Sequence, residues 1–517
     1  MRFRLISVVG VGVLAVAIVL ALAAPALAVD PTGQGLGTSA EEVTHTDFGL
    51  NLLWVVMGAV LVIFMQTGFA LVETGFCRAK HAAHVVMTNF AIFGLGFIGF
   101  FLVGYSLMFG AYSLPVIGYE DAVGGWLLKF GDFGGVLAGG GWALSGNGYD
   151  VGVMAFFLYM VAFMDTTATI PTGAMAERWK FKSFILWGLF CGALFYPLYG
   201  NWVWGGGWLS QLGNSLSLGH GVVDFAGSGV VHAMGGTAAL AGALVLGPRI
   251  GKFGPNGEPR TLAGHHIPMA ILGTFILLFG WFGFNAASTF AATDLRFTVV
   301  AANTAIAGAF GSIAGLLYYA RKTGKYDPGM AANGMLGGLV AITAPCAFVQ
   351  PWAAALIGTL AAPLVVTAIG FFERRRVDDP VGAISVHGVG GLFGVLCVGI
   401  FSDGTYGIGW NGTGVDAASG VSGILYGDAG QLVAQLIACG VIAIVGFGMA
   451  FSFFKIQNAL TKGGIRPTEE DELQGLDIPE LGVLGYPEFG VGAPSPATNG
   501  HFPEPATVPV GATTATE

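Results

Sequence analysis

The chain has 517 residues, of which 54% are hydrophobic and 10% are charged, and its mean hydropathy is +0.73. An average soluble domain carries roughly 25% charged residues, so this composition excludes a water-soluble globule and a disordered chain. Most of the outer surface is therefore expected to face lipid. The net charge of −9 provides no basic field for a nucleic acid partner. The 86 glycines are typical of closely packed membrane helices.

The first residues have the composition of a targeting segment. Arg2 and Arg4 precede an uncharged apolar run that ends in the small-residue pattern Ala-Leu-Ala at Ala28. This pattern predicts a cleaved signal peptide over residues 1–28, followed by an extracytoplasmic segment over residues 29–47. The run is longer than the apolar core of a signal peptide, roughly 7–15 residues. An uncleaved anchor helix is therefore the alternative.

Eleven apolar segments of membrane-spanning length follow the signal. They cover approximately residues 48–76, 84–112, 151–172, 181–201, 225–247, 266–290, 297–320, 329–349, 353–373, 382–402 and 429–458. If the mature N-terminus is outside, only Lys129 and Arg296 fall in outer connections, and all other basic residues after the signal lie in inner ones. The positive-inside rule then predicts a multi-pass protein with its N-terminus outside and its C-terminus in the cytoplasm.

A short motif occurs twice in these segments. Residues Val231–Gly236 read VHAMGG, and residues Val386–Gly391 read VHGVGG, five spans later. An odd number of spans inverts the direction of the helix, so the two copies are expected to be corresponding positions of an inverted repeat. The predicted fold is an all-α polytopic membrane protein with an inverted five-plus-five repeat and one final helix, an architecture common in transporters.

The composition changes after the last span, and this change sets the domain boundaries. We predict a membrane domain over residues 48–465 and a cytoplasmic tail over residues 466–517. The proximal tail, Pro467 to Glu480, is acidic and partly capable of forming a helix. The last ~30 residues are rich in Pro, Ala, Thr and Gly and are predicted to be disordered.

Two histidines at bilayer depth are the first functional candidates, because ionisable groups there are costly unless they serve a purpose. His232 and His387 occupy matching positions of the repeat, which would bring both to the central axis of the fold. Imidazole donates through one ring nitrogen and accepts through the other, so a pair can pass a small polar solute along an apolar tube. The alternatives are a core histidine bonded to a backbone carbonyl and a metal site, but no residues with ligand spacing flank either one. No cofactor or metal is predicted.

Three further residues have both a structural and a functional interpretation. Asp224 lies eight residues before His232, where it can cap the start of a helix or attract cations to the outer mouth. Trp204 falls in an outer connection, where it can belong to an interfacial aromatic belt or hold a desolvated cation by its ring face. For Glu73, near the inner end of the first span, we favour a hydrogen bond that packs helices.

Several motifs in the same order resemble those of the ammonium transporter (Amt/Mep/Rh) family, in its bacterial Amt form. The matching stretches are Gly68–Leu71 with Arg78–Lys80, Gly173–Arg178, Asp224–Gly227 with Val231–His232, Gly280–Ala286, Asp378–Pro380 with Val386–Val389, and Gly464–Arg466 with Gly475–Asp477. The resemblance begins at about residue 48 and extends into the proximal tail.

The resemblance implies a homotrimer with one pore in each subunit, in which ammonium is recruited outside, loses a proton and crosses a hydrophobic channel. By motif, His232 and His387 are the twin histidines of the channel and Asp224 supports the outer vestibule. The remaining site residues carried over are Trp204, Ser288 and Tyr159 for recruitment, and Phe163 and Phe284 for a stacked gate. Tyr159 stands where many bacterial members have phenylalanine, and its hydroxyl could accept from ammonium. The polar segment 164–169 and the long connection from Trp204 to Asp224 also depart from the family pattern.

The sequence thus predicts a non-enzymatic ammonium transporter of the plasma or inner membrane, and it leaves open whether ammonium or neutral ammonia is the net species. An ammonium sensor is the second candidate. The tail is too short for a fused kinase or cyclase, so a sensor would act through a separate PII-type protein docked on the basic inner loops and the proximal tail. A membrane enzyme using the two histidines lacks a nucleophile constellation. The tail motif argues against an Rh-like gas channel.

Overall fold

The computed structural model describes residues 45–414 and 419–489. The predicted signal peptide, most of the segment 29–47 and the predicted disordered end of the tail lie outside the described residues. The described residues from His45 to Gly485 form one compact unit, and a short 3-10 turn, Pro487–Phe489, belongs to a second unit that begins at Tyr486.

The first unit is a helical bundle. Its helices are α2 (His45–Phe76), α3 (Ala82–Gly99), α4 (Tyr105–Phe109), α5 (Val151–Met175), α6 (Phe181–Phe190), α7 (Tyr196–Val203), α8 (Leu212–Leu216), α9 (Met234–Leu246), α10 (Ile267–Trp281), α11 (Arg296–Thr323), α12 (Pro328–Thr343), α13 (Pro351–Arg374), α14 (Gly390–Phe401), α15 (Ala429–Val441), α16 (Phe447–Leu460) and α17 (Glu469–Gln474). Two short antiparallel strands, β1 (Gly125–Lys129) and β2 (Gly135–Gly139), form a hairpin between α4 and α5.

Several long helices contain a π-helical stretch, where one extra residue widens the turn. These stretches are Phe100–Gly104, Cys191–Phe195, Ser228–Ala233, Phe282–Ala286, Ile384–Val389 and Ile442–Gly446. Two of them contain the paired histidines. Such bulges are frequent at functional sites, so their positions agree with the residues that the sequence singles out.

Ten helices within the described ranges are long and apolar enough to cross a membrane, and their ends agree with ten of the predicted spans to within five residues. The predicted span 329–349 corresponds to α12, which has only 16 residues. Asp327 caps its start by accepting from the Met330 N–H, and the chain leaves the helix in turns around Pro345. Proline has no N–H to extend the helix, so α12 ends at Thr343 and is shorter than the predicted span 329–349.

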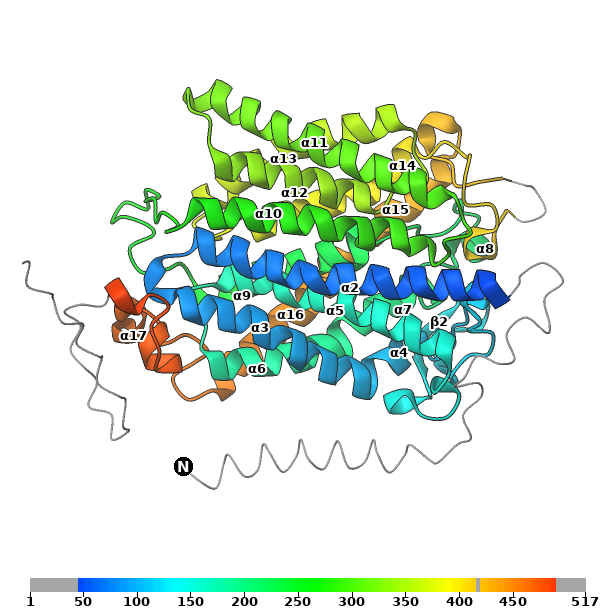
Figure 1. The fold of residues 1–517 in the computed structure, drawn as a ribbon, viewed down its shortest axis with the longest axis horizontal. Coiled ribbons are helices and arrows are strands. Elements are labelled where there is room, and N and C mark those ends of the chain that lie inside the picture. The colour runs from blue at the N-terminus through cyan, green and yellow to red at the C-terminus, as the bar shows by residue number, and fades with distance from the viewer. Residues whose placement is uncertain (1–44, 415–418, 490–517) are drawn as a thin grey trace, which may run out of the picture. The chain divides into compact units, whose positions relative to one another are not determined.

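Close backbone contact holds the long helices together. In Figure 1, α10, α2 and α3 lie side by side with their axes in nearly the same direction. A Cβ atom on Gly273 of α10 would lie 2.7 Å from the carbonyl oxygen of Gly68 on α2, so only glycine allows this approach. Small residues at such contacts are the usual basis of helix packing in lipid.

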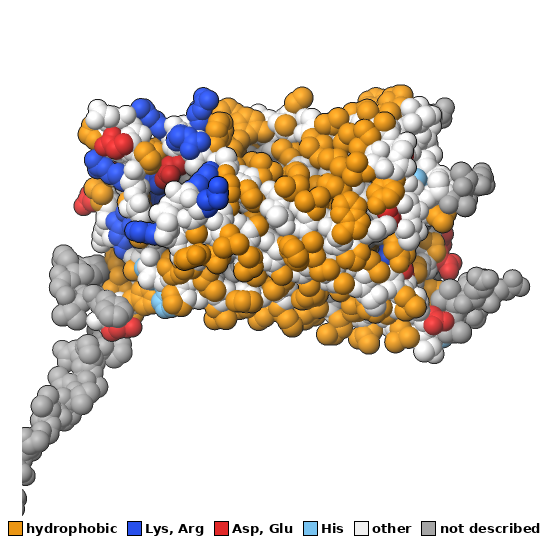
Figure 2. Space-filling model, turned by 90° about the horizontal axis from the view of Figure 1, so that it is seen from above, with side chains coloured by type: hydrophobic (Ala, Val, Ile, Leu, Met, Phe, Trp, Pro, Cys, Tyr) orange, Lys and Arg blue, Asp and Glu red, His pale blue; other side chains and the backbone are white. Residues whose placement is uncertain are grey.

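The surface has the pattern of a membrane protein. Figure 2 shows hydrophobic side chains across the middle of one face, with Lys and Arg gathered at one end. Exposed apolar residues such as Phe275, Phe279 and Phe310 contribute to the apolar surface. A surface of this kind is stable against acyl chains and not against water. It agrees with the spans derived from composition.

A buried ion-pair cluster joins the loops at the predicted cytoplasmic end. Glu177 accepts from Arg78 Nε at 2.6 Å and from Arg249 Nη1 at 2.9 Å. Arg249 also makes a bidentate pair with Asp378, at 2.9 and 3.1 Å. Glu177 is fully buried and adopts a φ of 69°. This left-handed conformation is unfavourable for a residue with a Cβ, so the cluster holds the backbone in place there.

The proximal tail packs against the same end, where its acidic residues accept backbone N–H groups. Asp477 accepts from the N–H of His84 at 2.8 Å, at the start of α3. Glu472 accepts from the N–H of Ile250 at 2.8 Å and pairs with Arg466. Arg466 donates in turn to the Leu246 carbonyl at the end of α9. The predicted helical tendency of this segment is confirmed by α17, which Thr468 caps.

The ion-pair cluster predicts a large effect of a conservative change. Replacing Glu177 by Gln leaves Arg249 with one buried partner fewer, and breaking a buried pair costs about 3–5 kcal/mol. We expect a clear fall in the melting temperature of the purified protein in detergent. The control is Glu258→Gln, which breaks a 3.7 Å pair with Arg260 whose side chains are half exposed. Such pairs contribute little, and equal melting temperatures for both variants would contradict the prediction.

The same cluster predicts a pH dependence. Burial alone would raise the pKa of the Glu177 carboxyl, but the charges of Arg249 and Arg78 outweigh burial and lower the pKa below its ordinary 4.5. A carboxylate with a lowered pKa stabilises the fold fully above the unfolded value and loses this contribution as the pH falls. The difference in melting temperature between wild type and Glu177→Gln should therefore be constant above pH 4.5 and shrink below it. A difference that grows on acidification would contradict this sign.

Candidate functional site

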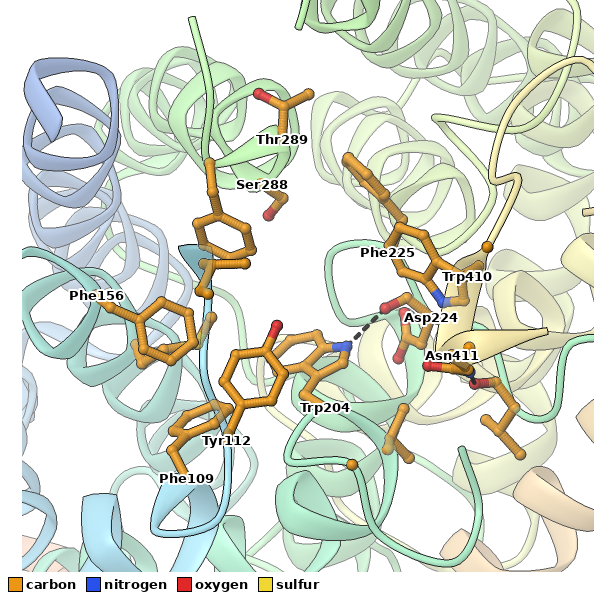
Figure 3. Close-up of a pocket in the computed structure, with 18 of the residues that line it drawn as sticks. Phe109, Tyr112, Phe156, Trp204, Asp224, Phe225, Ser288, Thr289, Trp410 and Asn411 are labelled. Atoms are coloured by element: carbon orange, nitrogen blue, oxygen red, sulfur yellow. Dashed lines mark hydrogen bonds between the residues drawn. The ribbon is translucent and has the colours of Figure 1, made fainter. Parts of the chain in front are cut away.

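A cavity of about 660 Å³ opens at the end of the bundle opposite the tail. It brings together Trp204, Asp224 and Ser288, which the sequence assigns to the outer vestibule, and Phe163, which the sequence assigns to the gate. Figure 3 shows that Trp204, Asp224 and Ser288 come from separate segments and surround the same space. Aromatic rings, including Phe225 and Trp410, form much of the remaining wall. The cavity is therefore a largely apolar bowl with few polar groups.

Asp224 is a structural cap at the base of this cavity. Its carboxylate accepts from the N–H groups of Gly227, Gly229 and Val230 at 2.8 to 2.9 Å, at the start of the π-helical stretch that contains His232. This is the capping arrangement predicted from the sequence. Its backbone carbonyl accepts from Trp204 Nε1 at 2.7 Å, the dashed contact in Figure 3. Asp224 thus orients the Trp204 ring and the histidine-bearing helix together.

The resemblance assigned Tyr159 to recruitment, with its hydroxyl as an acceptor for ammonium, but Tyr159 is not among the residues that line this cavity. Its hydroxyl lies 2.8 Å from the carbonyl oxygen of Gly283 and 3.0 Å from Ser288 Oγ. Ser288 Oγ lies 2.8 Å from the carbonyl of Phe284. The tyrosine hydroxyl therefore acts on the vestibule by holding Ser288.

Stacked rings close the floor of the cavity. The rings of Phe163 and Phe284 are parallel to within 20°, with centroids 4.1 Å apart. Trp204 meets Phe163 edge-on at 5.9 Å. On the far side, the His232 ring lies 5.4 Å from Phe284. The rings predicted as a gate thus form a continuous file from the vestibule to the first histidine.

The two histidines are in direct contact. Their Nδ1 atoms are 3.1 Å apart, and their rings are tilted by 24°. One Nδ1 must carry the proton and the other must accept it. When both rings are neutral, one therefore presents an Nε2–H donor and the other a bare Nε2 acceptor. In the described part of the chain, His232 Nε2 has no hydrogen-bond partner, so it is free to meet a solute.

Glycines make this contact possible. A Cβ atom on Gly236 would lie 2.2 Å from the Gly388 nitrogen, and one on Gly391 would lie 2.4 Å from the Ser228 carbonyl oxygen. The backbones of the two histidine-bearing helices therefore cross with no side chain between them. The Gly-Gly ends of the repeated motif supply both positions.

Asp379 is a functional residue that the sequence analysis did not single out. Its carboxylate accepts from the N–H groups of Gly382, Ala383 and Ile384 at 2.8 to 3.1 Å and caps the helix that contains His387. Burial raises its pKa to about 6. It precedes His387 by eight residues, as Asp224 precedes His232. This repeated spacing was the signal that could have identified it.

Arg296 was also not expected in the vestibule. Its guanidinium lines the cavity, pairs with Asp294 at 2.9 Å and lies 5.4 Å from the centre of the Phe225 ring. Its positive charge is thus balanced by a carboxylate. The sequence analysis had placed Arg296 in an outer connection, and only the fold brings it to the cavity wall.

Residues 45–414 and 419–489 contain no candidate metal site, because no three of their His, Cys, Asp or Glu side chains are placed to hold an ion.

Glu73 has the packing role that the sequence analysis favoured. Its carboxylate accepts from Asn89 of α3 at 2.7 Å and from Thr172 of α5 at 2.8 Å. It therefore ties α2 to two neighbouring helices.

Comparisons with known proteins give the family. The model of the Ammonium Transporter Family matches residues 53–486. The chain belongs to the ammonium transporter family. The ammonium transporter Amt2 of Archaeoglobus fulgidus is 42% identical over 447 residues, which cover 86% of this chain and 90% of that protein. Amt1 of Haloferax mediterranei is 36% identical over 454 residues and covers 85% of this chain and 80% of that protein.

Solved structures agree with this assignment. The structure of a sensor Amt protein superimposes with a TM-score of 0.72 at 33% identity, and covers 84% of this chain and 99% of that one. Candida albicans Mep2 superimposes with a TM-score of 0.67 at 26% identity, and covers 82% and 87%. The resemblance inferred from the motifs is thus confirmed. The relatives are named as transporters and not as enzymes.

The hydrogen bond between Tyr159 and Ser288 predicts that a change at Tyr159 weakens the binding of ammonium. Tyr159→Phe removes one hydrogen bond to Ser288 and leaves the ring stack intact, so Ser288 is less firmly held at the vestibule. We expect the half-saturating ammonium concentration to rise about twofold to tenfold, since a lost hydrogen bond costs roughly 0.5–1.5 kcal/mol. Uptake measured against ammonium concentration checks this. An unaltered half-saturating concentration would remove Tyr159 from the recruitment site.

Proposed function

We propose that this protein recruits ammonium at the outer vestibule, removes a proton there, and passes ammonia through the histidine pair into the cytoplasm. One observation carries the proposal: Phe163, Phe284, His232 and His387 follow one another in a single file below the cavity. This row of rings supplies the gate and the hydrogen-bonding histidines that such transport requires. The inverted repeat supports the same view, because the two capped, histidine-bearing helices correspond in spacing and in hydrogen bonding.

The vestibule suits ammonium as its first ligand. The indole face of Trp204 attracts a cation once water is partly removed, by up to ~2 kcal/mol. The hydroxyl of Ser288 accepts a hydrogen bond from an N–H group, which potassium cannot donate. Ammonium is therefore selected by donor geometry as well as by charge.

The histidine file suits the neutral species. A cation that enters an apolar tube loses its hydration, and an isolated charge in such surroundings is very costly. The tube offers no cage of carbonyl oxygens to replace that hydration, whereas the two Nε2 atoms supply hydrogen bonds to ammonia. The proton then either stays outside or crosses separately.

The assembly and location follow from the family. We propose a homotrimer in the plasma or inner membrane, with eleven spans after a cleaved signal, the N-terminus outside and the tail in the cytoplasm. The basic ends of the inner loops and the acidic proximal tail form the surface where a PII-type protein would dock. In the free chain, Glu472 and Asp477 of the tail already bind the loops, so such a partner would compete with these bonds.

An ammonium sensor is the second candidate. Its supporting observation is the 33% identity to the sensor Amt protein, whose whole length the chain nearly covers. A sensor that acts through a separate partner would bind ammonium in the same vestibule. Net flux through the histidine file distinguishes the two roles.

The test is a current measurement in proteoliposomes on a solid-supported membrane. We expect an ammonium jump to produce a transient current in wild type, and His232→Ala to abolish it because the hydrogen-bonding path is broken. His45→Ala changes an exposed histidine at the start of α2 and is the matched control. An internal pH dye separates the remaining cases: no current with a pH change means neutral ammonia flux, and neither signal means a sensor. Wild-type currents in His232→Ala would contradict the proposed path.

A further inference from the structure

A small cavity lies on the inner side of the histidine pair. Its volume is about 20 Å³, and its polar lining residues are His387, Glu73 and Asn333. A water molecule needs roughly 10–15 Å³ measured in this way, so the cavity has room for one molecule the size of water or ammonia. Phe69, whose ring lies 5.9 Å from that of His387, is part of the apolar wall. A solute that leaves His387 toward the inside therefore meets a carboxyl group next.

The surroundings of Glu73 suit both of its protonation states. Thr172 Oγ1 lies 2.8 and 2.9 Å from the two carboxyl oxygens and is also hydrogen-bonded to the Thr169 carbonyl. A hydroxyl has a single proton. It can donate to a Glu73 carboxylate, or it can donate to Thr169 and accept from a Glu73 carboxylic acid. Neither arrangement moves a heavy atom.

Glu73 is the only acidic residue that lines this cavity. Its lining includes no lysine or arginine. Asp379 does not line the cavity, although its chain neighbours Val381 and Ala383 do. The carboxylate of Asp379 is already engaged by three backbone N–H groups. Glu73 is fixed on its other side by Asn89 at 2.7 Å.

We propose that Glu73 exchanges a proton with ammonia at the inner end of the pore. This inference rests on the proposed function, because neutral ammonia must first pass His387. The Glu73 carboxylic acid gives its proton to ammonia, which becomes ammonium, and Glu73 becomes a carboxylate that receives the hydrogen bond of Thr172. Ammonium leaves to the inner aqueous phase. The carboxylate then takes a proton from inner water or buffer, which completes the cycle.

The test compares E73Q, E73D and wild type in proteoliposomes that contain a pH dye. Gln keeps the size of Glu and can accept from Asn89 and Thr172, but it cannot exchange a proton. We expect E73Q to lower the initial rate of the ammonium-driven internal pH change about tenfold or more, since positioned acids contribute roughly 10²–10⁴-fold. E73D should recover part of the rate. In E73Q alone, the rate of proton uptake, which is the rate of pH change multiplied by the inner buffering capacity, should rise with the inner buffer concentration, because ammonia must then take its proton directly from buffer and not from Glu73.

The matched control is D165N, which changes a second buried carboxyl of the membrane domain that does not line this cavity. It should keep the wild-type rate. Melting temperatures show whether each variant is folded. A folded E73Q with the wild-type rate, or an E73D as slow as E73Q, overturns the inference.

If E73Q does not fold, T172V decides, because it removes the hydroxyl that serves both states of Glu73. A lowered rate with an unchanged melting temperature supports the inference, and an unchanged rate overturns it. A wild-type protein without any ammonium-dependent signal overturns the transport function itself. The two failures are therefore distinguishable.

Discussion

The contact between two histidine rings at the centre of the bundle depends on a backbone approach that only glycine allows. Gly236 and Gly391 bring the helices of His232 and His387 so close that a methyl group on either glycine would overlap the opposite backbone. At this distance the two Nδ1 atoms share one proton, 3.1 Å apart. A shared proton leaves each ring with one remaining nitrogen for a solute. The chemistry of the pore thus follows from the packing of the backbone.

The two helices begin shortly before the histidines, at Ser228 and Ile384, and an aspartate caps each start. Asp224 and Asp379 each accept three backbone N–H groups that would otherwise be unsatisfied in a low-dielectric environment. These carboxylates are therefore held by the backbone and are not free to bind a permeating cation directly. The outer one also holds Trp204 through its backbone carbonyl. Asp224 therefore supports both Trp204, in the proposed recruitment site, and the helix that contains His232.

Pairs of charged side chains hold together the end of the molecule that bears the tail, and aromatic rings line the cavity at the opposite end. Arg249 binds Glu177 and Asp378 together, and the tail adds Glu472 and Asp477 to the loops around them. The vestibule instead has Trp204, Phe225 and Trp410, with Arg296 balanced by Asp294. This asymmetry suits the proposed function, in which a cation meets the aromatic end of the pore first and leaves at the end that bears the tail.

Local properties of the chain were sufficient to predict part of this structure. Hydropathy predicted ten of the membrane helices closely, because burial in lipid depends on composition over one segment. The repeated VHxxGG motif identified the histidine pair, and the position of Asp224 identified its capping role. The shorter α12 was not anticipated, because hydropathy does not report where a proline ends a helix.

Tertiary structure decided which side chains meet across the chain. His232 and His387 are 155 residues apart, Tyr159 and Ser288 are 129 apart, and Glu73 and Thr172 are 99 apart. The repeated motif anticipated that the two histidines meet, but hydropathy and short motifs do not place residues outside such a repeat, so the position of Glu73 beside the pore and the approach of Arg296 to the vestibule were not foreseen. The sequence by itself determined the membrane class and the family, and it named candidate site residues. Their mutual geometry was decided by helix packing, because contacts between distant segments depend on the whole fold.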